Sequence, residues 1–142
     1  MMKNKTVLIY LCWLISIFAL AGSLFFSEVM QFPPCELCWY QRICMYPLSI
    51  LFLVGSYRKS SDFFYYSFPL VSIGWLVSLF HNLLHFGIIP ESASPCRENV
   101  SCATVYIELF GFLTIPMMSL IAFSLLLIFL LIYKKDFLLD EK

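Results

Sequence analysis

The sequence predicts an all-α integral membrane protein, a bundle of four helices forming one domain over residues 1–142. The chain is 61% hydrophobic and only 13% charged, far more apolar than a water-soluble domain of this size needs to be. Four apolar runs are each long enough to cross a bilayer, for which a helix needs about 20 residues. Backbone polar groups in lipid must bond within their own segment, which excludes open strands. The runs span approximately 7–27, 39–57, 63–84 and 107–133.

The first run, residues 7–27, also resembles a secretory signal. Lys3 and Lys5 form a basic start, and the Ala-Leu-Ala segment at 19–21 fits a cleavage site. The apolar stretch nevertheless continues through residues 24–26, and the whole run is long enough to span a membrane. We therefore expect this helix to be retained rather than removed.

The second run, residues 39–57, follows a loop that carries two cysteines. Pro33 and Pro34 cannot continue a helix, and they stiffen the chain that leads to Cys35. Pro47 falls inside the run and is expected to kink the helix, which membrane helices tolerate. The cysteine pair is therefore expected where a stiff loop gives way to a helix.

The last two runs form a second helical hairpin. The Ser-Ser-Asp segment at 60–62 predicts a tight turn and a cap before the third run, residues 63–84. The fourth run, residues 107–133, carries Pro116 in its early turns. Each half of the chain is thus one hairpin with one cysteine pair in its connecting loop.

Basic residues cluster in three regions that alternate with the predicted spans, before the first, between the second and third, and after the fourth. The positive-inside rule makes this side the cytoplasm. We therefore expect a multi-pass protein of the cell membrane, in contact with lipid, with both termini cytoplasmic and the loops at 28–38 and 87–106 extracytoplasmic.

Disulfides persist outside the cytoplasm, and each outer loop holds a cysteine pair. The net charge is zero, which gives no indication of a nucleic acid partner. Apart from Arg42, just inside the second run, the only Lys or Arg on the opposite side is Arg97. The basic residues of the three regions are Lys3, Lys5, Arg58, Lys59, Lys134, Lys135 and Lys142.

The first cysteine pair, Cys35 and Cys38, has the Cys-x-x-Cys spacing that brings two sulfurs within reach of a short, reactive disulfide. Cys38 is expected in the first turn of a helix, where free N–H groups and the helix dipole favour a thiolate. Arg42 follows four residues later on the same helix face. A permanent positive charge at Arg42 lowers the pKa of a nearby sulfur, and an arginine at this depth is a candidate functional residue. The alternative interpretation is that the Arg42 side chain snorkels to lipid headgroups.

The second pair, Cys96 and Cys102, has five residues between its members. A disulfide that closes so small a loop removes little chain entropy, so its stabilising effect is modest. An exposed disulfide in a loop is well suited to attack by the thiolate of another protein. Redox exchange is therefore favoured over a structural bridge.

The remaining candidates favour simpler interpretations. The four outer cysteines have spacings compatible with a tetrahedral zinc site, but an oxidising exterior favours disulfides, and we expect no metal. Cys12 and Cys44 lie in apolar runs and are expected to serve packing. His81 and His85 share a helix face without the glutamate of a His-Glu-x-x-His site. A polar pair near the membrane surface is the default interpretation, and proton handling or cofactor contact is the alternative.

Taken together, these motifs resemble the disulfide bond formation protein B family. The resemblance rests on the segment 35–42 (Cys-Glu-Leu-Cys-Trp-Tyr-Gln-Arg), four helices and a second outer cysteine pair, and it covers essentially the whole chain. The segment 110–116, which opens the fourth run, is also similar. The match is closest to short-loop, BdbC-like thiol–disulfide oxidoreductases.

The resemblance implies a membrane enzyme that reoxidises an extracytoplasmic thioredoxin-fold thiol oxidase and passes electrons to a quinone. Carried onto this chain, Cys96 would be attacked by the partner and Cys102 would transfer the exchange to the inner pair. Cys38 would meet the quinone, with Cys35 as its exchanging neighbour. The spacing of the second pair differs from that of long-loop members, which leaves the order of the relay open.

The resemblance also implies quinone-site residues. Arg42 matches the arginine of the family's quinone site, and His81 takes approximately the position of its histidine in the third helix. Similarity to Gram-positive members points to menaquinone as the electron acceptor.

Three rival interpretations remain open at this level. The main one is a non-enzymatic membrane protein with four spans and two structural disulfides. A transporter of reducing equivalents would need mid-membrane cysteines with polar neighbours, which Cys12 and Cys44 lack. An enzyme of the vitamin K epoxide reductase type would carry its Cys-x-x-Cys in a late helix, whereas the fourth run contains no cysteine.

Overall fold

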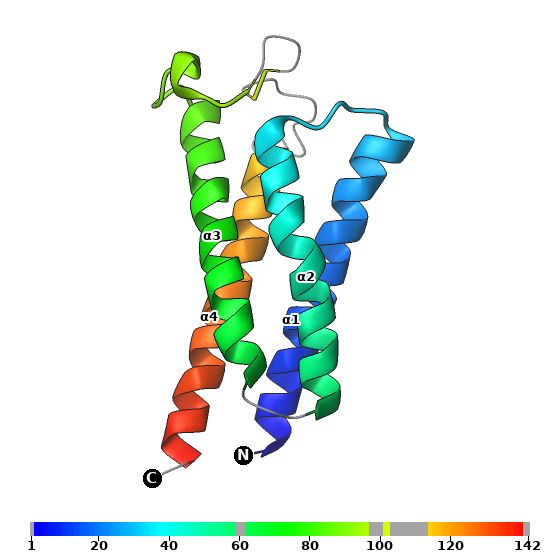
Figure 1. Ribbon diagram of the computed structural model, residues 1–142, viewed down its shortest axis with the longest axis vertical. Helices are drawn as coiled ribbons and strands as arrows, with labels where there is room; N and C mark the ends of the chain where they lie inside the picture. Colours follow the sequence, from blue (N-terminus) through cyan, green and yellow to red (C-terminus); the bar gives the residue numbers. More distant parts are fainter. Residues whose placement is uncertain (1, 59–61, 97–100, 103–113, 141–142) are drawn as a thin grey trace.

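The computed structural model describes residues 2–58, 62–96, 101–102 and 114–140. Over these residues the protein is all-helical, and four helices are long and apolar enough to cross a membrane, as the sequence predicts. The helices stand side by side, with both chain ends at one end of the bundle (Figure 1). They are α1 (Met2–Leu24), α2 (Glu36–Arg58), α3 (Asp62–His85) and α4 (Ile115–Asp140). A π-helical turn, Phe25–Val29, extends α1, and a 3-10 turn, Glu91–Ala93, follows α3.

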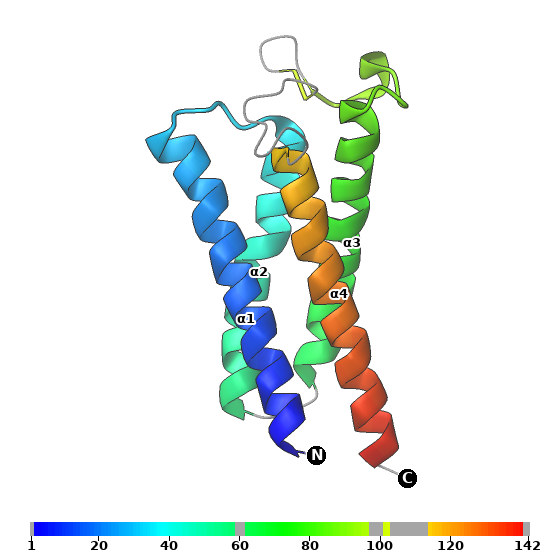
Figure 2. The ribbon, with the colours of Figure 1, turned by 180° about the vertical axis from the view of Figure 1, so that it is seen from behind.

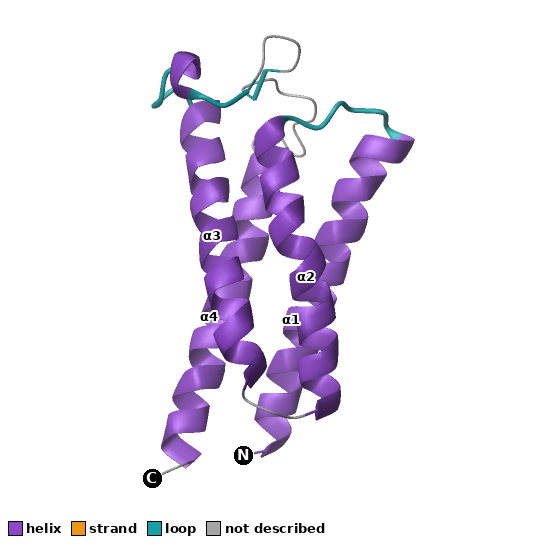
Figure 3. Cartoon of the chain, viewed as in Figure 1, coloured by secondary structure: helices purple, strands orange, loops and turns teal. Residues whose placement is uncertain are grey.

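The four helices form a closed ring in which α1 packs on α2, α2 on α3, α3 on α4 and α4 on α1. Loops at the end opposite the termini join the helices of each hairpin (Figure 3). Large apolar side chains fill the middle, including the fully buried Phe52 and Phe123. Outward side chains such as Phe18, Ile50 and Ile73 remain exposed, which suits a surface that faces lipid rather than water.

Small residues let α3 and α4 approach closely. Gly74 lies in α3 against the ring of Phe123, and a methyl group at position 74 would overlap that ring. Ser78 is fully buried on the same helix, and Ser119 Oγ donates a hydrogen bond to its hydroxyl over 3.4 Å. Small interfacial residues are the usual means by which membrane helices approach closely.

The start of α4 differs from the sequence prediction of about residue 107. Thr114 precedes the helix, its carbonyl accepts a hydrogen bond from the Met118 N–H over 3.0 Å, and the helix begins at Ile115. Pro116 therefore lies in the first turn, where its missing N–H would have had no helical partner. The expected helical residues 107–113 and the expected turn at 60–61 lie outside the described residues.

Candidate active site

The first cysteine pair lies where the loop after α1 enters α2. The carbonyl of Cys35 accepts a hydrogen bond from the Trp39 N–H over 3.2 Å, so Cys35 immediately precedes the helix and Cys38 lies in its first turn. Their sulfur atoms are 2.9 Å apart. Cys35 is buried and Cys38 is partly exposed. A modest rotation of either side chain would allow a disulfide to form or open.

The pKa of Cys35 is lowered to about 4, from the usual value of 9.0. The largest cause is a hydrogen bond with the Cys38 side chain, which stabilises the thiolate and outweighs the opposing effect of burial. A hydrogen bond from His81 lowers this pKa further. When the pair is reduced, the thiolate is therefore favoured on Cys35, and not on Cys38 as the sequence predicted.

His81 reaches the cysteines from α3 and is buried. Its Nε2 lies 3.8 Å from the sulfur of Cys35 and 3.2 Å from the carbonyl oxygen of Cys102. Because a carbonyl oxygen only accepts, this contact requires a hydrogen on Nε2. In the neutral ring Nδ1 then accepts from the Gln41 amide nitrogen, 3.3 Å away. One histidine thus contacts both cysteine pairs.

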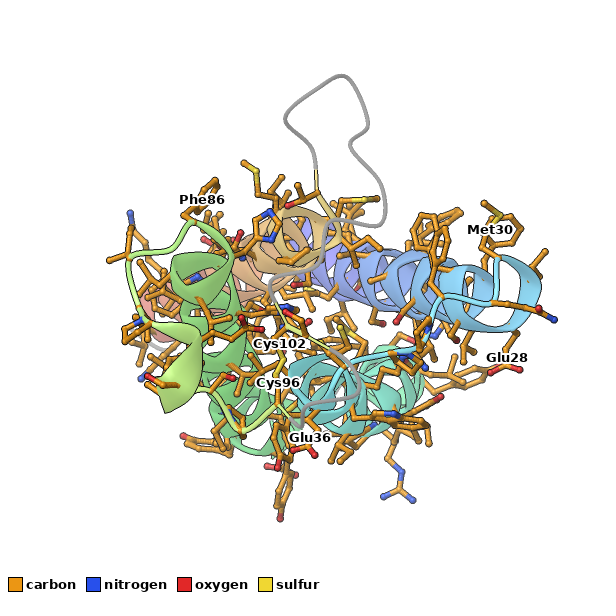
Figure 4. The ribbon with its side chains drawn as sticks, turned by 90° about the horizontal axis from the view of Figure 1, so that it is seen from above. Glu28, Met30, Glu36, Phe86, Cys96 and Cys102 are labelled. Atoms are coloured by element: carbon orange, nitrogen blue, oxygen red, sulfur yellow. A yellow bond between two sulfur atoms is a disulfide. The ribbon has the colours of Figure 1, made fainter. Side chains whose placement is uncertain are left out.

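The second cysteine pair, Cys96 and Cys102, forms a disulfide with a Cα–Cα distance of 6.0 Å. Cys102 is 3% exposed, whereas Cys96 is only partly buried. Seen from above, the disulfide lies over the bundle near the start of α2, while Met30 and Phe86 lie at opposite sides (Figure 4). Both cysteines belong to a small apolar cluster with Cys35 and Cys38. While this bridge is formed, Cys96 and Cys102 offer no thiolate to a zinc site on all four outer cysteines.

Arg42 lies one turn below Cys38 and is only 6% exposed. Its Nε donates to the Ser23 hydroxyl over 2.8 Å, and its Nη2 donates to the Ser23 carbonyl over 2.7 Å. The guanidinium also lies 5.3 Å from the ring centre of Trp39. The side chain therefore crosses to α1, which argues against an arginine that snorkels to headgroups.

A cavity of about 420 Å³ adjoins both cysteine pairs. Its walls are mainly apolar side chains of α1 and α4, two helices that diverge toward the cysteine end (Figure 2). Its polar lining includes Cys38, Arg42 and His81 together with Gln41. Such a space suits an apolar ring with polar oxygens, since ligand sites combine apolar walls with a few polar groups.

The structure therefore brings together all six residues that the sequence singled out, Cys35, Cys38, Arg42, His81, Cys96 and Cys102. It adds Ser23 and Gln41, whose partners lie on other helices. Cys12 and Cys44 lie in the apolar core, as expected of packing residues. His85 also lines the cavity, although it makes no contact with either cysteine pair among the hydrogen bonds of the described residues.

Two adjoining cysteine pairs at one end of a four-helix membrane bundle define a membrane thiol–disulfide oxidoreductase. The chain belongs to the DsbB family, whose model, "Disulfide bond formation protein DsbB", matches residues 5–133. It is 41% identical to disulfide bond formation protein C of Bacillus subtilis over 95% of this chain and 98% of the relative. It is 41% identical to a probable disulfide formation protein of Oceanobacillus iheyensis (94% and 93%) and 36% identical to one of Metapseudomonas resinovorans (90% and 90%). No solved structure matches the chain significantly.

Proposed function

We propose that this protein reoxidises a thioredoxin-fold thiol oxidase outside the cytoplasm and passes the electrons to a membrane quinone. It would thereby support disulfide formation in exported proteins, from a position in the cell membrane. The observation that carries the proposal is the position of His81, whose Nε2 contacts both Cys35 of the inner pair and the Cys102 carbonyl of the outer pair. Two cysteine pairs held so close are placed to exchange disulfides with each other.

The exposure of the outer pair supports a direction for the exchange. The partner's thiolate attacks the more accessible Cys96, forming a mixed disulfide and releasing the Cys102 thiolate. A second partner thiolate resolves the mixed disulfide, which leaves the partner oxidised and both Cys96 and Cys102 reduced. The buried Cys102 is then placed to attack the inner disulfide in the same apolar cluster. That exchange restores the outer disulfide and leaves Cys35 and Cys38 reduced.

The cavity supports a quinone as the acceptor, and its residues fit that group. A quinone supplies a lipid-soluble acceptor for two electrons and two protons. Cys38 reaches the cavity as the donor thiol, and Arg42 offers a fixed positive charge to an oxygen that gains negative charge. We further propose menaquinone, in keeping with the Bacillus relatives. Membership in the disulfide formation family favours this activity over a non-enzymatic protein with four spans.

The test is reconstitution of purified protein with a reduced thioredoxin-fold oxidase and a water-dispersible menaquinone analogue. We expect one quinone to be reduced for each partner disulfide formed. Replacing Cys35, Cys38, Cys96 or Cys102 by Ser should abolish turnover, whereas Cys12→Ser, a matched buried thiol, should retain it. Normal turnover by Cys96→Ser would show that the outer pair is only structural.

A further inference from the structure

The reduced inner pair and His81 form a cluster of donor atoms with the composition of a metal site. The sulfurs of Cys35 and Cys38 and a ring nitrogen of His81 all lie within 4.8 Å of one another. Two thiolates and one imidazole are soft or borderline ligands, which zinc and related d10 ions prefer over calcium or magnesium. We propose that the reduced protein captures one such ion on Cys35, Cys38 and His81, and that disulfide formation between the cysteines expels it.

The distances require only a small adjustment. At a tetrahedral zinc ion with Zn–S of about 2.3 Å and Zn–N of about 2.0 Å, two sulfurs lie about 3.8 Å apart and a sulfur and a nitrogen about 3.5 Å apart. The Cys35 sulfur already lies 3.8 Å from His81 Nε2. The two sulfurs, at 2.9 Å, must separate by about 0.9 Å to fit that geometry. Cys35 lies ahead of α2, so a change of its side-chain rotamer would supply this separation without unwinding the helix.

The surrounding groups fit a three-ligand site with one open position. His81 would bind through Nε2, giving up its contact with the Cys102 carbonyl, and Nδ1 would then carry the ring hydrogen. The Gln41 amide, 3.3 Å from Nδ1, can rotate so that its oxygen accepts that hydrogen, as the outer partner of a metal-bound histidine commonly does. The fourth position would face the cavity that Cys35, Cys38 and His81 share.

Redox state controls this site, because a disulfide offers no thiolate to a metal. Binding converts the Cys35 thiolate and the Cys38 thiol into metal thiolates and releases the Cys38 proton; no electron moves, and the ion remains divalent. Bound metal would hold the inner pair reduced and so prevent its reoxidation, a consequence that rests on the proposed function. Metal binding itself depends only on the reduced pair and His81.

Cadmium is the probe, because its thiolate complexes absorb in the ultraviolet and it takes the same ligands as zinc. The protein is full-length Cys96→Ala/Cys102→Ala in detergent, which lacks the outer disulfide and retains the inner pair with its sulfurs 2.9 Å apart. After reduction and removal of the reductant, we expect saturation at one cadmium ion per chain. The same sample reoxidised to the Cys35–Cys38 disulfide should bind none. Zinc should displace the cadmium and abolish the absorbance.

Two variants decide whether the three ligands act together. His81→Ala should weaken cadmium binding on the order of a hundredfold or more, given that even outer-shell changes cost ten- to a hundredfold. His85→Ala, one turn along the same helix, should leave it unchanged. Cys35→Ser/Cys38→Ser retains Cys12 and Cys44 and should bind no cadmium, with its helical circular dichroism confirming the fold. Equal binding by the reduced and reoxidised protein, or undiminished binding by His81→Ala, would overturn the site. Neither result depends on a quinone or a partner, so each is separable from failure of the proposed function.

Discussion

At the scale of single residues, the contacts of Arg42 explain how a charge is held near the membrane surface. A buried guanidinium must have its hydrogens satisfied, because an unpaired buried charge is costly. Ser23 satisfies two of its nitrogens, one through the hydroxyl and one through the carbonyl. The guanidinium is thereby fixed in the lining of the cavity instead of swinging toward lipid headgroups.

This contact predicts that Ser23 positions Arg42 for the acceptor. Ser23→Ala removes one charge-assisted hydrogen bond of about 1.5–3 kcal/mol but leaves the carbonyl contact. We expect the quinone KM to rise about five- to tenfold with a small change in kcat. Arg42→Ala should raise it further, and Arg42→Lys should fall between, because lysine keeps the charge without the fork of donors.

Steady-state quinone reduction measures this effect. Ser23→Thr retains a hydroxyl and is expected to keep the quinone KM near that of the parent protein. Ser27→Ala is the matched control, since among the described residues the Ser27 hydroxyl donates to the Leu24 carbonyl at the end of α1 over 3.2 Å and makes no hydrogen bond with Arg42. The exchange between the outer disulfide and the reduced partner should be unaffected in all of these variants. Unchanged quinone kinetics in Arg42→Ala would instead make this arginine an interfacial residue without a catalytic part.

The lowered pKa of Cys35 gives a second prediction at this scale. A thiol with a pKa lowered to about 4 stays ionised, and therefore reactive, as the pH falls from neutrality until it passes about 4. Alkylation of Cys35 in the reduced protein, followed by mass spectrometry with a chelator present, should show this profile. Cys38→Ala should move the midpoint upward because the main stabilising hydrogen bond is lost, and Cys38→Ser should move it less. A midpoint near the usual 9.0 in the parent protein would refute the assignment.

The sequence predicted much of this site because the helical repeat links residues that are close along the chain. The spacing between Cys38 and Arg42 places them one turn apart, and the observed α2 has that arrangement. Ser23 and Gln41 were missed, because their contacts depend on how α1 and α3 are rotated toward α2. Single-helix periodicity holds no information on that rotation. The contact between His81 and the Cys102 carbonyl of the outer disulfide was missed for the same reason.

At the scale of helices, sequence reasoning located the four spans but not all of their ends, since α4 runs over Ile115–Asp140 instead of 107–133 and α1 begins at Met2 instead of residue 7. Residues 107–113 lie outside the described residues, but Thr114 precedes α4 although the apolar run continues across it, so hydropathy alone does not locate the start of α4. Pro116 was the available signal, because proline is favoured in the first turn of a helix. Asn82 supports the observed start, since its side-chain amide donates to the Pro116 carbonyl over 2.8 Å and ties α4 to α3.

The close contact between α3 and α4 predicts the effect of enlarging Gly74. In Gly74→Ala the new methyl group overlaps the Phe123 ring, so α3 and α4 must separate or Phe123 must leave its position. We expect a loss of about 1–3 kcal/mol in stability, as for other overpacked cores. Thermal unfolding in detergent, followed by helical circular dichroism, would measure it. Gly22→Ala is the control, because a methyl group there meets no atom within 4 Å, and equal midpoints for the two variants would contradict the packing argument.

At the scale of the whole molecule, charge and chemistry divide the bundle into two ends. The end that carries the chain termini also carries Lys5, Arg58 and Lys134, whereas both cysteine pairs lie at the other end (Figure 1). The acidic residues Glu28 and Glu36 lie at the cysteine end (Figure 4). An excess of basic residues marks the cytoplasmic side, so the cysteine end is expected to face outward, where disulfides persist.

This orientation predicts which thiols an impermeant reagent reaches in intact cells. After mild reduction, a charged maleimide should label Cys96, the more accessible member of the outer pair, and should leave Cys12 and Cys44 unlabelled, because both are buried in the core. A cysteine appended after Lys142 should be labelled only when the membrane is permeabilised, because it is expected on the cytoplasmic side. Mass spectrometry of the labelled peptides separates these thiols. If the appended cysteine were labelled in intact cells and Cys96 were not, the bundle would have the opposite orientation. The outer disulfide would then face the reducing cytoplasm, where a thiol oxidase could not be kept oxidised through it.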